Sequence, residues 1–114
     1  MKEFLLIFRM DVAIQSNVSP EDMQNRMKLW QDWMGSIAAQ NKLVSSGNRL
    51  ATEGRVVKKD NIITNGPYVE IKEAIGGYSI VRAASLDEAA EIANGCPILM
   101  GGGTVEVRTI VPMD

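Results

Sequence analysis

The stretch that decides the fold is "EFLLIF", residues 3–8, close to the start of the printed sequence. Its five consecutive apolar residues make a run of strand length. Because apolar and polar residues do not alternate in it, we expect a central strand that is covered on both faces. Alternation along a strand gives each face its own set of side chains, Phe4, Leu6 and Phe8 on one face and Leu5 and Ile7 on the other. The fold must therefore supply cover for both sides of this strand.

A long helix is predicted after the first strand. "SPEDM", residues 19–23, offers Ser19 as N-cap, Pro20 at the first helical position and two acids in the first turn. The helix should run to about Asn41. Apolar residues recur on one of its faces at steps of four and three, namely Met23, Met27, Trp30, Met34 and Ile37, with Trp33 beside them. We expect this face to cover a sheet and to serve as core rather than as a cofactor site.

The middle of the chain reads as three short strands. Residues 42–51 form a strand in which Gly47 indicates a bulge or bend. "RVVKKDNIITNG", residues 55–66, reads as a hairpin at the margin of the sheet that turns at Asp60 and Asn61 and stops at Asn65-Gly66.

The last third of the chain predicts a strand, a helix and a final strand. "GYSIVRA", residues 77–83, alternates as a sheet strand should. The next helix has Ser85 as N-cap with Glu88 three residues on, which is a capping box, and Gly95 as its left-handed C-terminal residue. A flexible "MGGG" then leads to a final strand over residues 104–111.

The predicted order of elements is β, α, β, hairpin, β, α, β. Two split β-α-β units of this kind make an α+β ferredoxin-like sandwich, an antiparallel sheet with two helices on one face. The length of 114 residues suits one domain over residues 1–114.

Two helices leave the second face of such a sheet uncovered. If roughly 600 Å² of mostly apolar sheet stays open, its burial contributes on the order of 15 kcal/mol gross, against about 4–15 kcal/mol for association. We therefore expect a homodimer through the open sheet face. The alternative is a monomer in which the short hairpin folds across that face.

Composition narrows the classes of partner and the location. The chain is 46% hydrophobic and 23% charged, with a net charge of -2, and its basic residues are not clustered, so we expect no nucleic-acid partner. No segment has the length of a signal peptide or a membrane span, which predicts no membrane association. The single cysteine, Cys96, fits a reducing compartment, so we expect a cytoplasmic protein. The sequence has no histidine.

The segment "NGPYVEIKEAIGGYSIVRAASLDEAAEIANGCP", residues 65–97, resembles the YCII-related family, in particular its DGPF branch. The flanking "LVSSGNRLA" and "GGGTVEVRTI" are also similar to that branch. The resemblance implies a dimeric α/β barrel architecture and a cleft between the sheet and its partner as the place of any chemistry.

The sequence departs from the family pattern where catalysis is concerned. The resemblance implies a histidine acting with the Asp of the Asp-Gly-Pro-Phe motif, whereas Asn65 stands at that position and no histidine exists. An amide does not ionise, so it cannot replace a carboxylate in proton transfer. The catalytic residues are unknown, and whether the protein is an enzyme stays open.

Five residues are the candidate ligand contacts, namely Asn65, Tyr68, Tyr78, Arg82 and Arg108. Alternation places Tyr78, Arg82 and Arg108, with Glu106, on the open sheet face, and we expect them to surround Phe4, Leu6 and Phe8 there. The alternative is that these charges lie at the rim of the dimer and pair with one another. Asn65-Gly66-Pro67 has an alternative role as a backbone turn.

Neither a metal nor another cofactor is expected. Histidine is absent, the acids lack ligand spacing, and Cys96 lies away from any helix N-terminus that would activate it. Gly76-Gly77 lacks the pattern of a phosphate-binding loop and more simply permits close backbone approach.

Two functions remain open. One is a homodimer that binds a small molecule in a cleft at the sheet or the dimer seam, and it predicts a bounded cavity. The other is a non-catalytic accessory protein that engages a protein partner, which the resemblance links to transcription initiation, and it predicts an exposed apolar patch instead.

Overall fold

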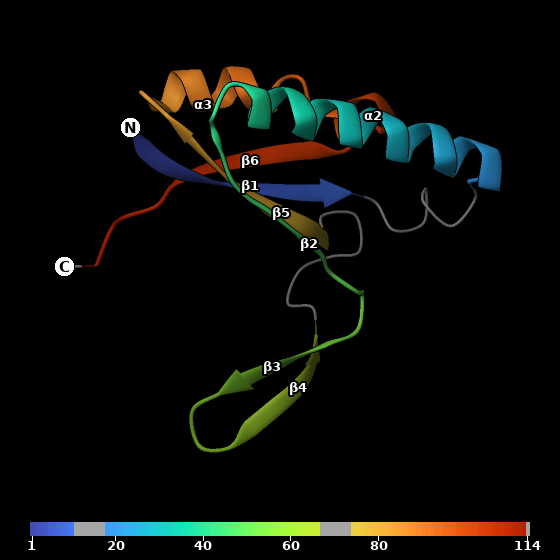
Figure 1. Ribbon diagram of the computed structural model, residues 1–114. Helices are drawn as coiled ribbons and strands as arrows, with labels where there is room; N and C mark the ends of the chain where they lie inside the picture. The colour runs from blue at the N-terminus through green and yellow to red at the C-terminus, as the bar shows by residue number, and fades with distance from the viewer. Residues whose placement is uncertain (11–17, 67–73, 114) are drawn as a thin grey trace.

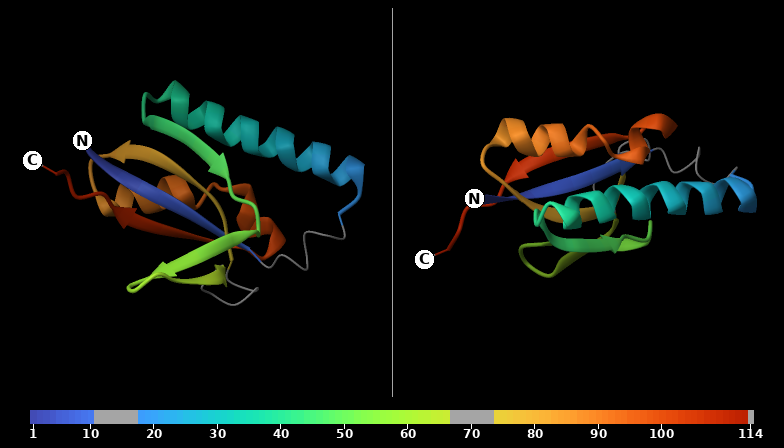
Figure 2. Two further views of the ribbon diagram at one scale, coloured as in Figure 1. Left: turned by 90° about the horizontal axis from the view of Figure 1, so that it is seen from below. Right: turned by 45° about the horizontal axis from the view of Figure 1, so that its top comes forward.

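The computed structural model describes residues 1–10, 18–66 and 74–113. Within them, two α-helices lie side by side over one face of a four-stranded antiparallel sheet (Figure 1 and Figure 2). The strands of this sheet are β1 (Lys2–Met10), β2 (Leu43–Arg49), β5 (Ala74–Ala83) and β6 (Thr104–Thr109). Their spatial order, β2-β5-β1-β6, is that of a ferredoxin-like sandwich. The predicted α+β fold class is confirmed, with the sheet of one chain open rather than closed into a barrel.

Both helices begin where their capping residues predict. In α2 (Pro20–Ala39) the Ser19 Oγ accepts a hydrogen bond from the Asp22 backbone N–H at 3.2 Å. In α3 (Leu86–Ala93) the Ser85 Oγ accepts one from the Glu88 backbone N–H at 3.1 Å. These bonds satisfy backbone donors that have no partner inside the helix, which is why each helix starts at its serine.

The end of α3 differs from the prediction. Its C-cap is Asn94 with φ -62°, and Gly95 is not among the glycines with positive φ. The prediction that Gly95 ends the helix in a left-handed conformation was therefore wrong. A Cβ at residue 95 would lie 3.1 Å from the Trp33 Nε1, so this glycine serves close packing rather than helix termination. The chain continues into a 3-10 helix, η2 (Pro97–Gly101), which Gly102 closes with φ 84°. Part of the segment predicted to be flexible is therefore helical.

The central strand β1 is confirmed, but its two faces were assigned the wrong way round. Phe4, Leu6 and Phe8 are only 1%, 0% and 5% exposed, and they lie in the core beneath the helices. The core also contains Trp33 and Ile37 of α2 and, from α3, Ala89 and Ala93. Alternation decides which residues share a face, but not which face the helices cover. The set with the two large aromatic side chains lies under the helices because burying them removes the most apolar surface from water.

The open face therefore has Leu5 and Ile7 at its centre. Across the strands, Leu5 lies opposite Ile80 and Arg108, and Ile7 lies opposite Tyr78 and Glu106. Directly opposed residues share a face, so the polar residues expected on the open side do lie there, around Leu5, Ile7 and Ile80. Figure 2 (left) shows the molecule from this side.

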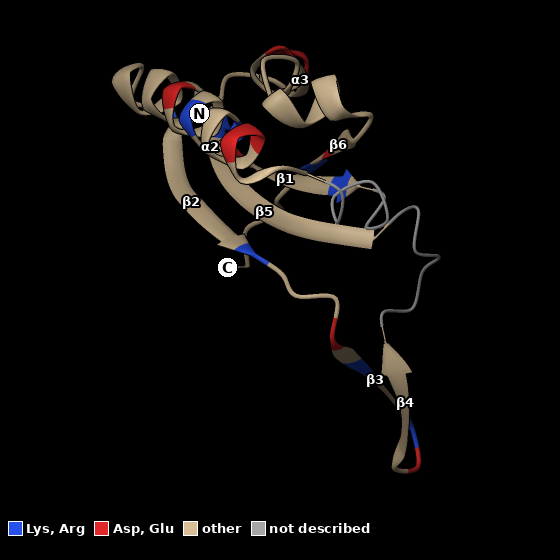
Figure 3. Ribbon diagram, turned by 90° about the vertical axis from the view of Figure 1, so that its right-hand side faces the viewer, with Lys and Arg blue, Asp and Glu red and all other residues tan. Residues whose placement is uncertain are grey.

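The hairpin forms its own two-stranded sheet, made of β3 (Gly54–Lys58) and β4 (Ile62–Gly66). It turns as predicted at Asp60 and Asn61, whose φ values are 67° and 63°. The extensive contacts of β3 and β4 are with each other, and the hairpin projects away from the sheet on the side opposite the helices (Figure 1 and Figure 3). The monomer alternative required the hairpin to fold across the open face, and the hairpin does not do so.

Candidate functional site

A groove of about 570 Å³ lies between the first half of α2 and the sheet, with η2 on its other side. The sheet contributes the ends of β1 and β2 and the start of β5. A volume of this size falls within the range of sites for small organic molecules. It is a groove between sheet and helix that is partly open to solvent.

The groove exists because α2 continues past the part of the sheet that it covers (Figure 1). Trp33 and Ile37, in the second half of the helix, are buried, and Trp30 and Met34 pack against the core. One to three turns earlier, Met23 and Met27 are 48% and 60% exposed and line the groove. The prediction that the whole apolar row covers the sheet and serves as core is confirmed for its second half and wrong for these two methionines.

Methionine dominates the walls. Five of the seven methionines of the chain line the groove, namely Met10, Met23, Met27, Met34 and Met100. Thioether side chains are flexible and polarisable, so they adapt to apolar partners of different shape. The Met10 side chain lies directly against β5, since a Cβ at Gly76 would lie 2.6 Å from its Cε atom. The close backbone approach expected at Gly76-Gly77 is confirmed at Gly77, where a Cβ would lie 2.8 Å from the Asn48 carbonyl oxygen.

Aromatic rings support the inner end of the groove. Trp30 packs edge-to-face on Phe8, with centroids 4.9 Å apart, and on Trp33, with centroids 5.6 Å apart. The Trp33 Nε1 donates a hydrogen bond to the Ile92 carbonyl oxygen at 3.1 Å. Within the described part of the chain the Trp30 Nε1 donates none. The two tryptophans thus differ, because Trp33 fixes α2 to α3 and Trp30 keeps a donor that a ligand can use.

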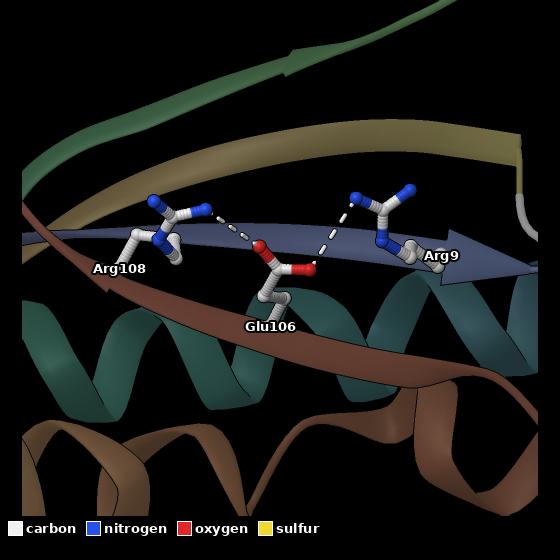
Figure 4. Close-up of polar contacts among 3 residues, drawn as sticks. All are labelled: Arg9, Glu106 and Arg108. Atoms are coloured by element: carbon white, nitrogen blue, oxygen red, sulfur yellow. Dashed lines mark hydrogen bonds and ion pairs between the residues drawn. The ribbon is translucent and has the colours of Figure 1, made fainter. Parts of the chain in front are cut away.

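The open face of the sheet carries a separate polar cluster. Glu106 accepts hydrogen bonds from the Arg9 Nη2 at 3.3 Å and from the Arg108 Nη1 at 3.2 Å, on the side away from the helices (Figure 4). The hydrogen bond from Arg108 and the charge of Arg9 lower the pKa of Glu106. A carboxylate held ionised in this way is a weak base near neutral pH, so this cluster is better suited to binding than to proton transfer.

The five candidate ligand residues are not gathered at one site. Tyr78, Arg82 and Arg108 share the open sheet face, where the Tyr78 hydroxyl accepts a hydrogen bond from the Asn48 Nδ2 at 3.2 Å. Tyr78 also borders the groove. Asn65 is exposed on the hairpin, opposite Arg55, and Tyr68 lies outside the described residues.

Arg82 has an unusual environment. Its Nε is buried and has no hydrogen-bond partner within the residues that the structure describes. An unsatisfied buried donor is unfavourable, because the group has lost water without gaining an acceptor. Because the atoms of the chain itself enclose this Nε, it is not presented to a ligand or a second copy on the open face.

Sequence reasoning missed the groove and its two charged residues, Arg26 and Arg49. Only one local signal indicated the groove. Met23 and Met27 lie in the first turns of α2, whereas Trp33 and Ile37, which pack into the core, lie in its C-terminal half. The groove joins α2, β2, β5 and η2, which are far apart in the sequence.

Other chemistry is restricted. Cys96 is the N-cap residue of η2, so the expectation that it lies away from any helix N-terminus was wrong. It is nevertheless buried, and burial raises the pKa of its thiol to about 11, in agreement with the expected inert cysteine. Across residues 1–10, 18–66 and 74–113, no group of three or more His, Cys, Asp or Glu side chains is arranged to hold a metal ion. None of the helices in these ranges is long and apolar enough to cross a membrane.

Comparison with known proteins places the chain in a family. The family model described as the YCII-related domain matches residues 10–114. This range contains the open-face cluster except Arg9 and all of the groove residues except Phe8. No curated protein matches the chain.

Proposed function

Because the chain belongs to the YCII-related domain family, we propose that it binds a small molecule in the groove between α2 and the sheet. The observation that carries this proposal is the groove of about 570 Å³, whose walls include methionine and tryptophan side chains. Apolar walls with a few polar groups are typical of small-molecule sites. The sequence motif that starts at Asn65 and continues through Gly76-Gly77 favours the DGPF branch of the family.

The proposal is for binding and assigns no catalytic residue. The chain has no histidine, and Asn65 stands where the resemblance implies an aspartate. Glu106 is held ionised by two arginines. The reducing compartment indicated by the single buried cysteine makes the cytoplasm the place where we expect the protein to act.

We further propose that the protein is a homodimer through the open sheet face. Leu5, Ile7 and Ile80 are partly exposed at the centre of this face and form an apolar surface that a second copy would cover. In such a dimer Tyr78, Arg82 and Arg108 lie at the seam, where they contact the second copy or a ligand held between the copies.

The accessory-protein alternative is favoured by a different observation. Three apolar side chains of the hairpin are strongly exposed, namely Val57, Ile62 and Ile63, at 71%, 51% and 63%. An isolated two-stranded hairpin is marginally stable in water, so a partner that covers these residues would stabilise it. A protein partner, including one in transcription, is the second candidate function.

Binding of N-phenyl-1-naphthylamine, a neutral dye that fluoresces in apolar sites, tests the groove proposal. We expect saturable binding that Met23→Gln and Met27→Gln together weaken by roughly tenfold, because each exchange removes apolar contact from a wall. Met113→Gln is the matched control, since Met113 is 98% exposed and lies outside the groove. If Met23→Gln and Met27→Gln leave dye binding unchanged, and Val57→Gln and Ile63→Gln abolish it, the accessory function would be favoured instead.

A further inference from the structure

The lining residues of the groove that the structure describes carry charge of one sign only. Arg26 on α2 and Arg49 at the end of β2 are the ionised side chains among them, and none of these described lining residues is an aspartate or a glutamate. The protein as a whole has a net charge of -2, so a general excess of basic residues does not explain this lining. The positive charge is a local property of the groove.

Both guanidinium groups are free to bind a ligand. Within the described residues, the ion pairs involve Arg9 and Arg108 with Glu106, and Lys42 with Glu88. Arg26 and Arg49 take part in none of them, and both side chains are exposed. A cationic side chain that pairs with no acid on its own chain keeps its full capacity for an external anion.

The two arginines come from opposite walls. Arg26 lies one turn before Trp30 on α2, so the two residues share a helix face. Arg49 follows the bulge at Gly47 and lies opposite Gly77 of β5, which has no side chain to separate it from the groove. The Trp30 Nε1, which donates no hydrogen bond in the described residues, adds a third donor between these walls.

An apolar groove whose described lining includes two guanidinium groups and no carboxylate selects a particular kind of molecule. A cationic ligand would be repelled by both arginines, and a neutral one would leave them unmatched. Carboxylates, phosphates and sulfonates match the planar fork of arginine with two parallel hydrogen bonds. We propose that the ligand of this groove is an apolar, ring-sized molecule with one anionic group, held by Arg26 and Arg49. This inference rests on the small-molecule function proposed above.

A matched pair of dyes separates the anionic group from the apolar body. 8-Anilino-1-naphthalenesulfonate has the same aromatic framework as N-phenyl-1-naphthylamine and adds a sulfonate. We expect the sulfonate dye to bind the wild-type protein more tightly than the neutral dye. Arg26→Gln and Arg49→Gln should each weaken sulfonate binding by roughly fivefold, the value of an exposed charge contact of about 1 kcal/mol, and leave neutral binding unchanged.

Arg55→Gln on the hairpin is the matched control, because Arg55 is an exposed arginine outside the groove. Far-UV circular dichroism and the urea midpoint of each variant show whether it is folded. Competition by 1-naphthoate, 1-naphthyl phosphate and neutral 1-naphthol then identifies the anion. Stronger displacement by the first means a carboxylate ligand, by the second a phosphate ligand, and by the naphthol a neutral one, which would overturn the inference.

The remaining outcomes distinguish the two proposals. If the neutral dye binds in the groove but the sulfonate dye binds no better, or if the arginine variants bind both dyes as the wild type does, the anionic ligand is wrong and the groove stands. If neither dye binds, the small-molecule function and the anionic ligand are both wrong. If only the sulfonate dye binds and the groove arginines are required, the anionic group is the main determinant of recognition.

Discussion

At the scale of single residues, the closest backbone contact that shapes the groove is at Gly47. This residue has φ 71° and forms the bulge that brings Arg49 to the groove. A Cβ at this position would overlap the carbonyl oxygen of Tyr78 on the neighbouring strand. The glycine thus combines a left-handed backbone with a close approach between strands, and the close approach leaves no room for a Cβ.

We predict that Gly47→Ala lowers the free energy of unfolding by at least about 2 kcal/mol, because strain at positive φ adds to a clash with main-chain atoms. Urea unfolding followed by circular dichroism measures the change. Gly35→Ala is the opposite case, since its Cβ meets nothing within 4 Å in the middle of α2, and it should stabilise the protein by about 0.5–1 kcal/mol. Equal effects of the two substitutions would contradict this account of Gly47.

Single residues also show where sequence reasoning reaches its limit. The bulge at Gly47 and the turn at Asp60-Asn61 were predictable because positive φ restricts residue type locally. The role of Gly95 was not, because its neighbour Trp33 is distant in the sequence. The same limit applies to Phe4, Leu6 and Phe8. The sequence correctly predicted that they share one face of β1, but the prediction that this face is the open one was wrong.

At the scale of elements, α3 is joined to the start of β2 by one carboxylate. The Glu88 Oε1 accepts a hydrogen bond from the Lys42 Nζ at 3.0 Å and from the Ala84 backbone N–H at 3.5 Å. Lys42 directly precedes β2, so this group links the first turn of a helix to a strand at the edge of the sheet. Only half of the predicted capping box is present: the Ser85 Oγ accepts from the Glu88 N–H, but the Glu88 carboxylate bonds to Ala84 and Lys42 rather than to the N–H of the N-cap Ser85.

This contact predicts a pH dependence of stability. The hydrogen bond from Lys42 lowers the pKa of Glu88, so the folded pKa lies below the unfolded value of about 4.3. The contribution to stability is therefore present above the unfolded pKa and is lost as pH falls through the folded one. Glu88→Gln should be less stable than the wild type at neutral pH, and the difference should shrink between about pH 5 and pH 3.

Urea unfolding at a series of pH values measures this difference. Glu91→Gln, on the same helix and outside the ion pairs of the described residues, controls for the loss of one negative charge. A gap between wild type and Glu88→Gln that stays constant down to pH 3 would show that the carboxylate does not act through ionisation.

Elements also explain why the fold was easier to predict than the site. Each helix start depends on a serine and the next three residues, so Ser19 and Ser85 could be read directly from the sequence. The groove depends on how far α2 continues past the sheet and on η2, which no local pattern indicated. Alternation along the strands predicted that Tyr78, Arg82 and Arg108 share a face, and they do. Arg26 and Arg49 line the same groove only because of the tertiary structure, which no local pattern shows.

At the scale of the whole molecule, the chain is a thin layered body with one covered and one open side. Its extents are 46 × 44 × 18 Å, and the hairpin adds to its width on the open side (Figure 3). The helices cover Phe4, Leu6 and Phe8, while Leu5 and Ile7 have no cover from the described residues on the other side. A second copy related by a two-fold axis would cover the open face with the same surface of its own sheet.

We predict that the protein is a dimer at micromolar concentration and that Ile7→Lys converts it to a folded monomer. A lysine at the centre of a two-fold interface meets its own copy across the axis, so both burial and charge repulsion oppose association. Leu86→Lys is the matched control, because Leu86 is 50% exposed and lies on α3, on the covered side of the sheet. Size-exclusion chromatography with light scattering gives the mass, and binding of the neutral dye shows that the groove of the monomer is intact. A monomeric wild type, or an Ile7→Lys variant that remains dimeric, would mean that the open face is not the interface.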